Sequence, residues 1–301
     1  MILHYDKIMF ESLLYECESS TGIDYFIIEK DYYVTLFLKE LNKRVPNLLF
    51  KGGTSLSKCY KIIDRFSEDI DLSLVNKTYT QGDRRRLKSV IIDLCCQLNL
   101  NIDNLENIRS RRDFNRYEIN YKSNYSPNGL YPKLLVETVF FADAYPINKK
   151  DVTSIIYDYL IEKKDYETIK KYDLSPFEIN VQSLERTLID KIYALCDYAI
   201  SNKIYRHSRH LYDIHMILPL IDINDDFIKL FNEVRNKRSK YDFCYSAKEN
   251  INLKVLLNQI IDDKIYYSDY VNVTEKLLTK KINYDEVIES LKNILNSNLF
   301  K

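Results

Sequence analysis

The chain has 301 residues, of which 46% are apolar and 29% charged, an ordinary globular composition with enough apolar material for one large domain or two smaller ones. Acidic and basic side chains balance at 44 each, which argues against binding to polyanions through bulk charge but allows local basic patches. No apolar run approaches the ~20 residues of a membrane span, and the N-terminus lacks the apolar segment of a signal peptide. The six cysteines form no C-x-x-C pair, so we expect free thiols. These features predict a soluble cytoplasmic protein with no membrane partner.

The first half of the chain mixes helical periodicity with the strict alternation of strands. The clearest strand is DIDLSLV, in which apolar side chains take one face and Asp69, Asp71 and Ser73 the other. The expected elements are helices over 7–19, 29–42, 54–64 and 83–98 and strands over 47–50, 69–75, 114–122 and 133–141.

After a last expected strand at 177–182, the pattern is almost wholly helical. The change from alternation to helical period falls between Ala144 and Phe177. We therefore expect an α+β fold, with a mixed head over residues 1–150 and a mainly helical C-terminal domain over residues 151–301.

One stretch, FKGGTSLSKCYKIIDRFSEDIDLSL (residues 50–74), differs from the rest. It places Gly52 and Gly53 together although the chain holds only five glycines, and it ends in the strand on which Asp69 and Asp71 share a face. Carboxylates at i and i+2 of a strand lie roughly 7 Å apart and point the same way. Two like charges so placed repel each other unless a cation neutralises them.

A hard divalent cation such as Mg²⁺ meets this need, since it is usually held by one or two carboxylates together with substrate phosphate oxygens. The glycines would let the backbone approach a triphosphate closely and donate N–H groups to it. The nucleotide-binding residues expected from this stretch are Lys51, Gly52, Gly53, Thr54, Ser55, Arg65 and Ser67.

Each half of the stretch also has an ordinary interpretation. A D-x-D in an amphipathic strand is usually its solvated face, and a glycine pair before a helix is usually a turn. The stretch lacks the G-x-x-x-x-G-K-[ST] of a P-loop. The order strand, glycine pair, Thr/Ser, helix and D-x-D strand is much more specific than either half alone.

That order resembles motif I of the nucleotidyltransferase superfamily, in which a glycine turn precedes D-x-D on the next strand. The finer match, FKGGTSLSKCY followed by RFSEDIDL, is similar to the AbiEii/AbiGii toxin family, the toxins of AbiE-type toxin–antitoxin and abortive-infection phage-defence systems. IEKDYYVTLFLKEL (28–41) resembles the family's N-terminal helix, and SLERTLIDKIYAL and RHLYDIHMI resemble its later helices. The resemblance implies a nucleotidyltransferase-like head.

Glu137 is the expected third carboxylate of a two-metal site with Asp69 and Asp71, since nucleotidyl transfer normally needs one. It stands among apolar residues in KLLVETVFF, an unfavourable place for an unpaired charge. Lys133, four residues earlier on the same face, is expected to contact phosphate or to pair with Glu137, and this spacing resembles motif II of the family. The alternative is a surface Lys–Glu pair on an edge strand.

Two later residues complete the expected catalytic set. Lys191 lies near the apolar side of its helix, where it snorkels or, as in the resembling family, projects into a cleft between domains and binds the phosphates. Asp213 falls on the polar side of the next helix; the resemblance implies a role in activating the acceptor hydroxyl, and the alternative is a surface acid paired with Arg209. His210 stands where relatives often carry an acid.

The resemblance implies a toxin that transfers NMP from an NTP, such as GTP or CTP, to an RNA acceptor. The first candidate for this acceptor is the tRNA 3′ end, whose modification would block translation. Its expected partner is an AbiEi-like antitoxin that acts without a stable complex. The basic segments RSRRDFNR (109–116) and RNKRSKY (235–241) suit RNA phosphates and stacking, or are solvated loops. Two other functions stay open: nucleotidyl transfer to a small molecule such as an antibiotic, and non-catalytic binding of a nucleotide or an antitoxin.

Overall fold

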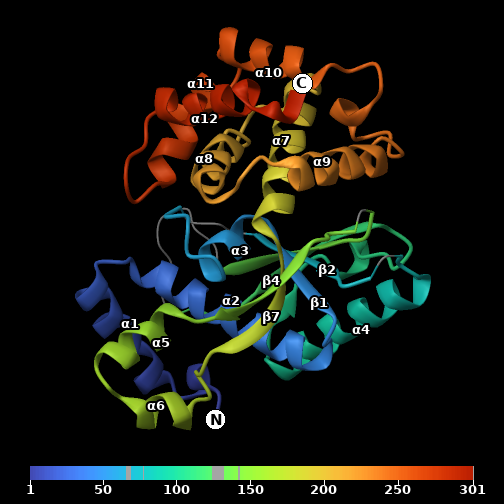
Figure 1. Ribbon diagram of the computed structural model, residues 1–301. Helices are drawn as coiled ribbons and strands as arrows, with labels where there is room; N and C mark the ends of the chain where they lie inside the picture. Colours follow the sequence, from blue (N-terminus) through green and yellow to red (C-terminus); the bar gives the residue numbers. More distant parts are fainter. Residues whose placement is uncertain (66–68, 77, 124–131, 142, 301) are drawn as a thin grey trace. The chain divides into compact units, whose positions relative to one another are not determined.

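The computed structural model describes residues 1–65, 69–76, 78–123, 132–141 and 143–300, which form two compact units (Figure 1). The first unit comprises residues 1–60, 67–143 and 148–181, and the second comprises residues 61–66, 144–147 and 182–301. The first unit holds a mixed sheet with helices and the second is helical, so the expected α+β class is confirmed. The first unit extends past residue 150 because β7 (Phe177–Gln182) pairs with β1 (Leu48–Lys51) in the sheet.

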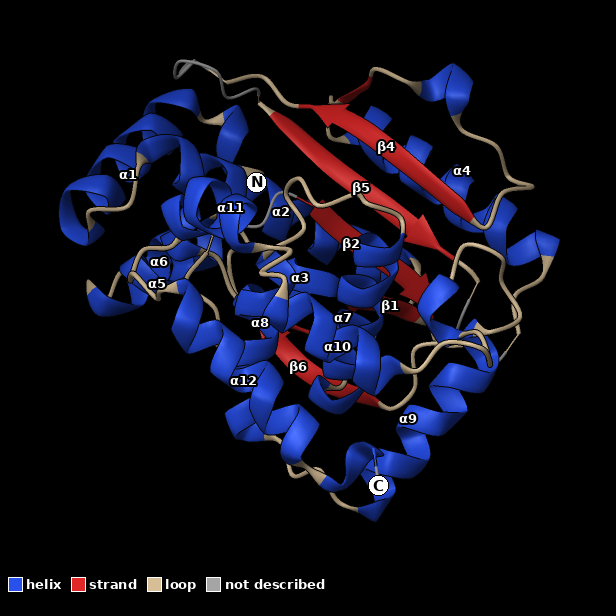
Figure 2. Cartoon of the chain, turned by 90° about the horizontal axis from the view of Figure 1, so that it is seen from above, coloured by secondary structure: helices blue, strands red, loops and turns tan. Residues whose placement is uncertain are grey.

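Within the described residues, seven strands form one mixed sheet in the order β3-β4-β5-β2-β1-β7-β6. The other strands are β2 (Asp69–Leu74), β3 (Asn101–Ile102), β4 (Phe114–Asn120), β5 (Lys133–Val139) and β6 (Ile147–Val152). β2 pairs antiparallel with β1 and parallel with β5, and β5 pairs antiparallel with β4. Figure 2 shows β4, β5, β2 and β1 side by side.

One face of this sheet is apolar and forms the core of the first unit. Ile70 and Leu72 of β2 and Val136 of β5 are fully buried, because alternation turns all three to the same side. The long helix α2 (Tyr25–Arg44) contacts β5 and also α4 (Gln81–Gln97), and both helices contribute to the same hydrophobic core. The other face of β2 is therefore left to Asp69 and Asp71, which are half-buried.

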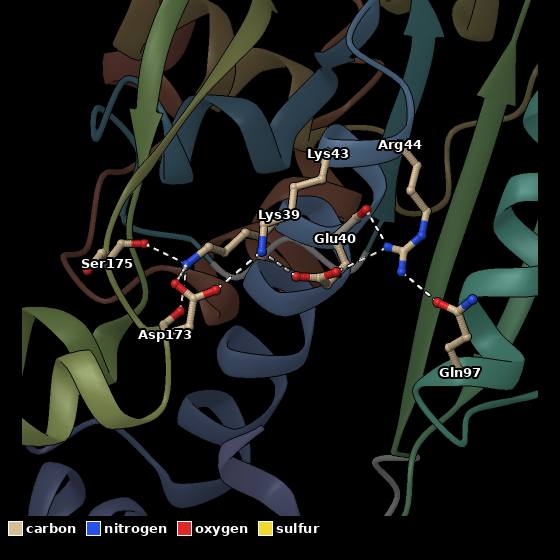
Figure 3. A network of polar contacts seen from close by, with 7 residues as sticks. All are labelled: Lys39, Glu40, Lys43, Arg44, Gln97, Asp173 and Ser175. Atoms are coloured by element: carbon tan, nitrogen blue, oxygen red, sulfur yellow. Dashed lines mark hydrogen bonds and ion pairs between the residues drawn. The ribbon is translucent and has the colours of Figure 1, made fainter. Parts of the chain in front are cut away.

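A buried lysine ties α2 to the segment between α6 (Tyr166–Lys171) and β7. Lys39 donates to the Asp173 carboxylate at 2.8 Å and to the carbonyl oxygens of Asp173 and Ser175 at 2.5 and 3.1 Å (Figure 3). Three acceptors offset the desolvation of this ammonium group. The remaining helices of the unit are α1 (Lys7–Thr21), which contacts α2, and α5 (Ile155–Glu162), which contacts α1 and α2.

β3, α5 and α6 are additional to the expected elements, and two further differences have a clear physical reason. The helix expected over 54–64 is α3 (Gly52–Lys58), which ends earlier because Lys61 adopts a left-handed φ of 55° and residues 61–66 join the second unit. β6 was not expected, because its sequence INKKDV is mostly polar. It lies at the edge of the sheet, where polar side chains remain exposed and strand propensity gives little signal.

The second unit is built around α7 (Leu184–Ile200), which contacts α8 (Arg209–Ile217), α9 (Asp225–Arg238) and α10 (Leu253–Asp262). α8 also contacts α12 (Tyr284–Asn296), and α11 (Tyr267–Asp269) is a single turn. Across the described ranges, we find no helix that combines the length and the apolar character needed to cross a bilayer. The six cysteines are free thiols, as expected.

Candidate functional site

Four charged residues lie opposite one another across four neighbouring strands of the first unit. Lys51 of β1 pairs in register with Asp71 of β2, Asp71 with Glu137 of β5, and Glu137 with Arg116 of β4. Residues directly opposite in a sheet point to the same face. We call these four residues the charged row; its order across the sheet is basic, acidic, acidic, basic.

The two acidic residues at the centre of the charged row, Asp71 and Glu137, lie close enough for their negative charges to interact. The pKa of Glu137 is raised, first by burial and then by the neighbouring charges of Asp71 and Asp69. The Arg116 guanidinium opposes this rise: its Nε and Nη2 lie 2.7 and 2.5 Å from Oε1 of Glu137. Arg116 is thus a cation of the fold itself that partly neutralises the acidic face of the sheet.

The glycine turn is packed directly against this acidic face. Gly52 has a left-handed φ of 74°, and a Cβ atom added to it would overlap the carboxylate of Asp71. The Thr54 hydroxyl donates to the carbonyl oxygen of Asp69, which fastens α3 to β2. The glycine turn and the D-x-D strand, predicted as two halves of one site, are therefore in contact.

The side chains expected to bind a nucleotide beside the turn are engaged within the fold. Thr54 and Ser55 are buried, and the Ser55 hydroxyl donates to the Gly52 carbonyl at 2.8 Å. What α3 offers a ligand is the set of backbone N–H groups in its first turn, which includes Gly53 and has no intrahelical acceptor. Ser67 lies outside the described residues.

Lys133 does not pair with Glu137. Its ammonium group lies 2.7 Å from Glu118 and 3.3 Å from Asp103. The edge-strand alternative is also wrong, because β5 lies between β4 and β2. Lys133 is a half-buried member of a charged cluster with Glu118 and Asp103, and its contact with phosphate stays a prediction.

In the second unit, Asp213 holds two cations. Its carboxylate is fully buried and lies 2.8 Å from both Nε and Nη2 of Arg65 and 2.7 Å from Nζ of Lys191. Although burial opposes ionisation, these two cations hold the pKa of Asp213 well below its usual range. The interpretation of Asp213 as a surface acid is therefore wrong, and so is the snorkelling of Lys191, which is itself buried.

This geometry bears on the role expected for Asp213. A carboxylate whose two oxygens are occupied by cations, and whose pKa is depressed, is a poor proton acceptor. Asp213 is suited to fixing Arg65 and Lys191. The neighbouring His210 is uncharged, since burial and nearby cations lower its pKa well below the usual value.

The metal site expected at Asp69, Asp71 and Glu137 has suitable oxygen ligands, but the three carboxylates do not converge on one point. Hard carboxylate oxygens on one face suit Mg²⁺, yet within the described ranges no three His, Cys, Asp or Glu side chains are grouped so as to hold a metal ion. Glu137 is turned to Arg116 instead. These three carboxylates suit Mg²⁺ if Glu137 releases Arg116 and binds the metal ion instead.

Arg116 is the site residue that the sequence reasoning missed. It was grouped with the basic segment 109–116 as an RNA contact. Alternation along β4 could have found it, because Arg116 and Glu118 share the polar face of that strand.

Two of the four basic side chains of the second basic segment, 235–241, are engaged inside the second unit. Arg235 donates to the carbonyl oxygens of Lys248 and Ile251, at 3.1 and 2.7 Å. Arg238 is half-buried between Asp190 and Asp197, with its guanidinium 5.3 Å from the Tyr193 ring centroid. These two arginines are structural and are not available to RNA phosphates.

A glycine turn packed against a D-x-D strand, with a third carboxylate on the adjacent strand, is typical of nucleotidyl transferases. The sequence model of one family, described as "Nucleotidyl transferase AbiEii toxin, Type IV TA system", matches residues 37–291. The chain belongs to this family, since the match covers most of its length and parts of both units. It is therefore a toxin of the nucleotidyl transferase type with a cognate antitoxin. No curated protein matches it.

Proposed function

We propose that this toxin is a Mg²⁺-dependent nucleotidyltransferase that moves NMP from an NTP to an RNA acceptor, with the tRNA 3′ end as the first candidate. The charged row beside Gly52 carries the proposal. Its two carboxylates, Asp71 and Glu137, lie beside Asp69 on one face of the sheet, and the glycine turn with its backbone N–H groups is packed against them. Transfer of NMP to tRNA would block translation in the cytoplasm and arrest growth.

Asp69, Asp71 and Glu137 would hold the ion, which supplies charge neutralisation and orientation for the triphosphate. Glu137 would leave Arg116, whose guanidinium then becomes available to an anionic substrate group. The backbone N–H groups at the start of α3 would donate to phosphate oxygens. Lys191, fixed by Asp213, keeps the phosphate-binding role inferred from the family.

The test incubates the full chain with each α-³²P-labelled NTP, total bacterial RNA and Mg²⁺. We expect label in the tRNA fraction with wild type and none with Asp71→Asn, while Asp151→Asn, an exposed aspartate of β6, labels like wild type. Equal labelling by Asp71→Asn would refute the assignment. NTP binding without label in any RNA would favour a small-molecule acceptor or a non-catalytic role.

A growth assay separates the non-catalytic alternative from a toxin that acts by nucleotidyl transfer. Expression of wild type is expected to arrest growth, and Asp71→Asn is expected to be tolerated. Arrest by both variants would show that transfer chemistry is not the toxic function. Co-expression with the cognate antitoxin is expected to restore growth without a complex that survives gel filtration.

A further inference from the structure

The first unit contains a small cavity that takes no part in the charged row. It has a volume of about 240 Å³ and is lined by α1, α2 and the turn after α4. Its aromatic lining consists of His4, Tyr5, Phe10, Tyr25 and Tyr33. This volume is below the range of drug-sized pockets, so the cavity suits a group about as large as an amino-acid side chain.

A buried carboxylate also lines this cavity. Glu29 of α2 is 2% exposed and, among the described residues, accepts one hydrogen bond, from the hydroxyl of Ser123 at 2.5 Å. No basic side chain of the described ranges forms an ion pair with it. Burial raises the pKa of Glu29 to about 7, which shows how little the surroundings compensate its charge.

The tyrosine rings of the cavity lie close to this carboxylate. After burial, the charge of Glu29 is the main cause that raises the pKa of the Tyr25 hydroxyl, and it also raises that of Tyr33. Tyr33 stacks on Tyr121 with ring centroids 4.2 Å apart. The Tyr121 hydroxyl is buried and has no hydrogen-bond partner in the described part of the chain, so a donor or acceptor is left unused beside Tyr33.

The other charged groups around the cavity do not neutralise Glu29. Lys7 and Lys122 are exposed, so water and salt screen their ammonium groups. Glu11, at the rim, adds negative charge. His4 is neutral at pH 7, because burial lowers its pKa to about 4. The field inside the cavity is therefore that of a carboxylate surrounded by aromatic faces, and both attract a cation.

We propose that this cavity binds the alkylammonium group of a small amine, with Glu29 as its counter-ion and the rings of Phe10, Tyr25 and Tyr33 as its walls. The site is independent of the proposed transfer chemistry. Aromatic faces around a cation are the usual arrangement for ammonium recognition, and Glu29 supplies the charge that a purely aromatic cavity lacks.

The test measures binding to the full-length protein by isothermal titration calorimetry at pH 8 and fixed ionic strength. Two probes of equal length are compared, n-butylammonium chloride and n-butanol. We expect saturable binding of butylammonium at least tenfold tighter than of butanol. Because this comparison uses wild type alone, it does not depend on the folding of any variant.

Two variants then locate the site. Glu29→Gln keeps the shape of the side chain and is expected to weaken butylammonium binding at least tenfold. Glu162→Gln, an exposed glutamate of α5, is the control and is expected to bind like wild type. Equal affinity for the two probes, no saturable butylammonium binding, or wild-type affinity in Glu29→Gln would each overturn the proposal.

Discussion

Gly52 and Asp71 are packed so closely that the carboxylate of Asp71 occupies the space where any other residue at position 52 would place its Cβ atom. The glycine is thus required twice, by its left-handed backbone and by the acid beside it. The two requirements can be separated, because Gly22 has nearly the same φ, 70° against 74°, with nothing within 4 Å of its added Cβ.

The first prediction compares alanine at these two glycines. In Gly22→Ala the only cost is an alanine held in the left-handed backbone conformation, so the free energy of unfolding is expected to fall by about 1–2 kcal/mol. Gly52→Ala must also displace Asp71, and overpacking adds about 1–3 kcal/mol. Urea denaturation measures both, and the transfer assay should fail only for Gly52→Ala. Equal losses of stability would show that Asp71 yields without strain.

The second prediction concerns the buried carboxylate of Asp213. In Asp213→Asn, Arg65 and Lys191 keep their charges and lose their counter-ion, so the free energy of unfolding should fall by about 3–5 kcal/mol. The exposed control Asp151→Asn should stay within about 0.5 kcal/mol. A loss below about 1 kcal/mol for Asp213→Asn in urea denaturation would contradict the structure, since exposed pairs give that much.

Asp213 also predicts a direction for acid unfolding. Its pKa is depressed in the folded state, so its contribution is complete above its unfolded pKa of about 4 and is lost as the pH falls below that value. The difference in stability between wild type and Asp213→Asn should therefore shrink between about pH 4 and the lower folded pKa. A constant difference across this window would be inconsistent with an ionised Asp213.

The third prediction concerns the ion pair that occupies Glu137. Arg116→Gln removes the cation that competes with a metal for this carboxylate, and the pair is half-exposed on the arginine side. Such pairs are worth about 0.5–1 kcal/mol, so affinity for Mn²⁺, used as the probe metal, should rise roughly two- to fivefold. The exposed Arg112→Gln is the control. Weaker Mn²⁺ binding by Arg116→Gln would mean that Arg116 supports the ion and does not compete with it.

The fourth prediction is a pH dependence of stability at Glu29. Its folded pKa is about 7 and its ordinary value 4.5, so the folded state binds the proton more tightly. Stability should then fall as the pH rises through this window and be unaffected below it. Glu29→Gln should be more stable than wild type by about 3 kcal/mol at pH 8 and nearly equal at pH 4. A difference that does not change with pH would show that Glu29 titrates normally.

The site residues that could be predicted from the sequence are those that lie close to one another along the chain. Gly52, Asp69 and Asp71 fall within one short stretch, and alternation alone puts both aspartates on the polar face of β2. The helical pattern likewise predicts α2, which was expected over 29–42 and spans Tyr25–Arg44. The contact between Gly52 and Asp71 follows from the antiparallel pairing of β1 with β2, which sets Lys51 opposite Asp71.

What sequence could not supply are partners that depend on strand order. The expected pairing of Lys133 with Glu137 follows from spacing along β5, whereas the actual partner of Glu137 comes from β4 through register. A surface position was an alternative for Asp213 because the residue falls on the polar side of its helix. Its burial depends on Arg65, which stands far earlier in the chain.

The chain passes between its two units more than once, and this has a consequence for preparing either unit by itself. Residues 61–66 and 144–147 are counted with the helical unit, although the segments on either side belong to the sheet unit. A fragment of residues 182–301 alone would lack Arg65 and leave the buried Asp213 with one of its two cations. The helical unit prepared by itself therefore needs residues 61–66 as well as residues 182–301.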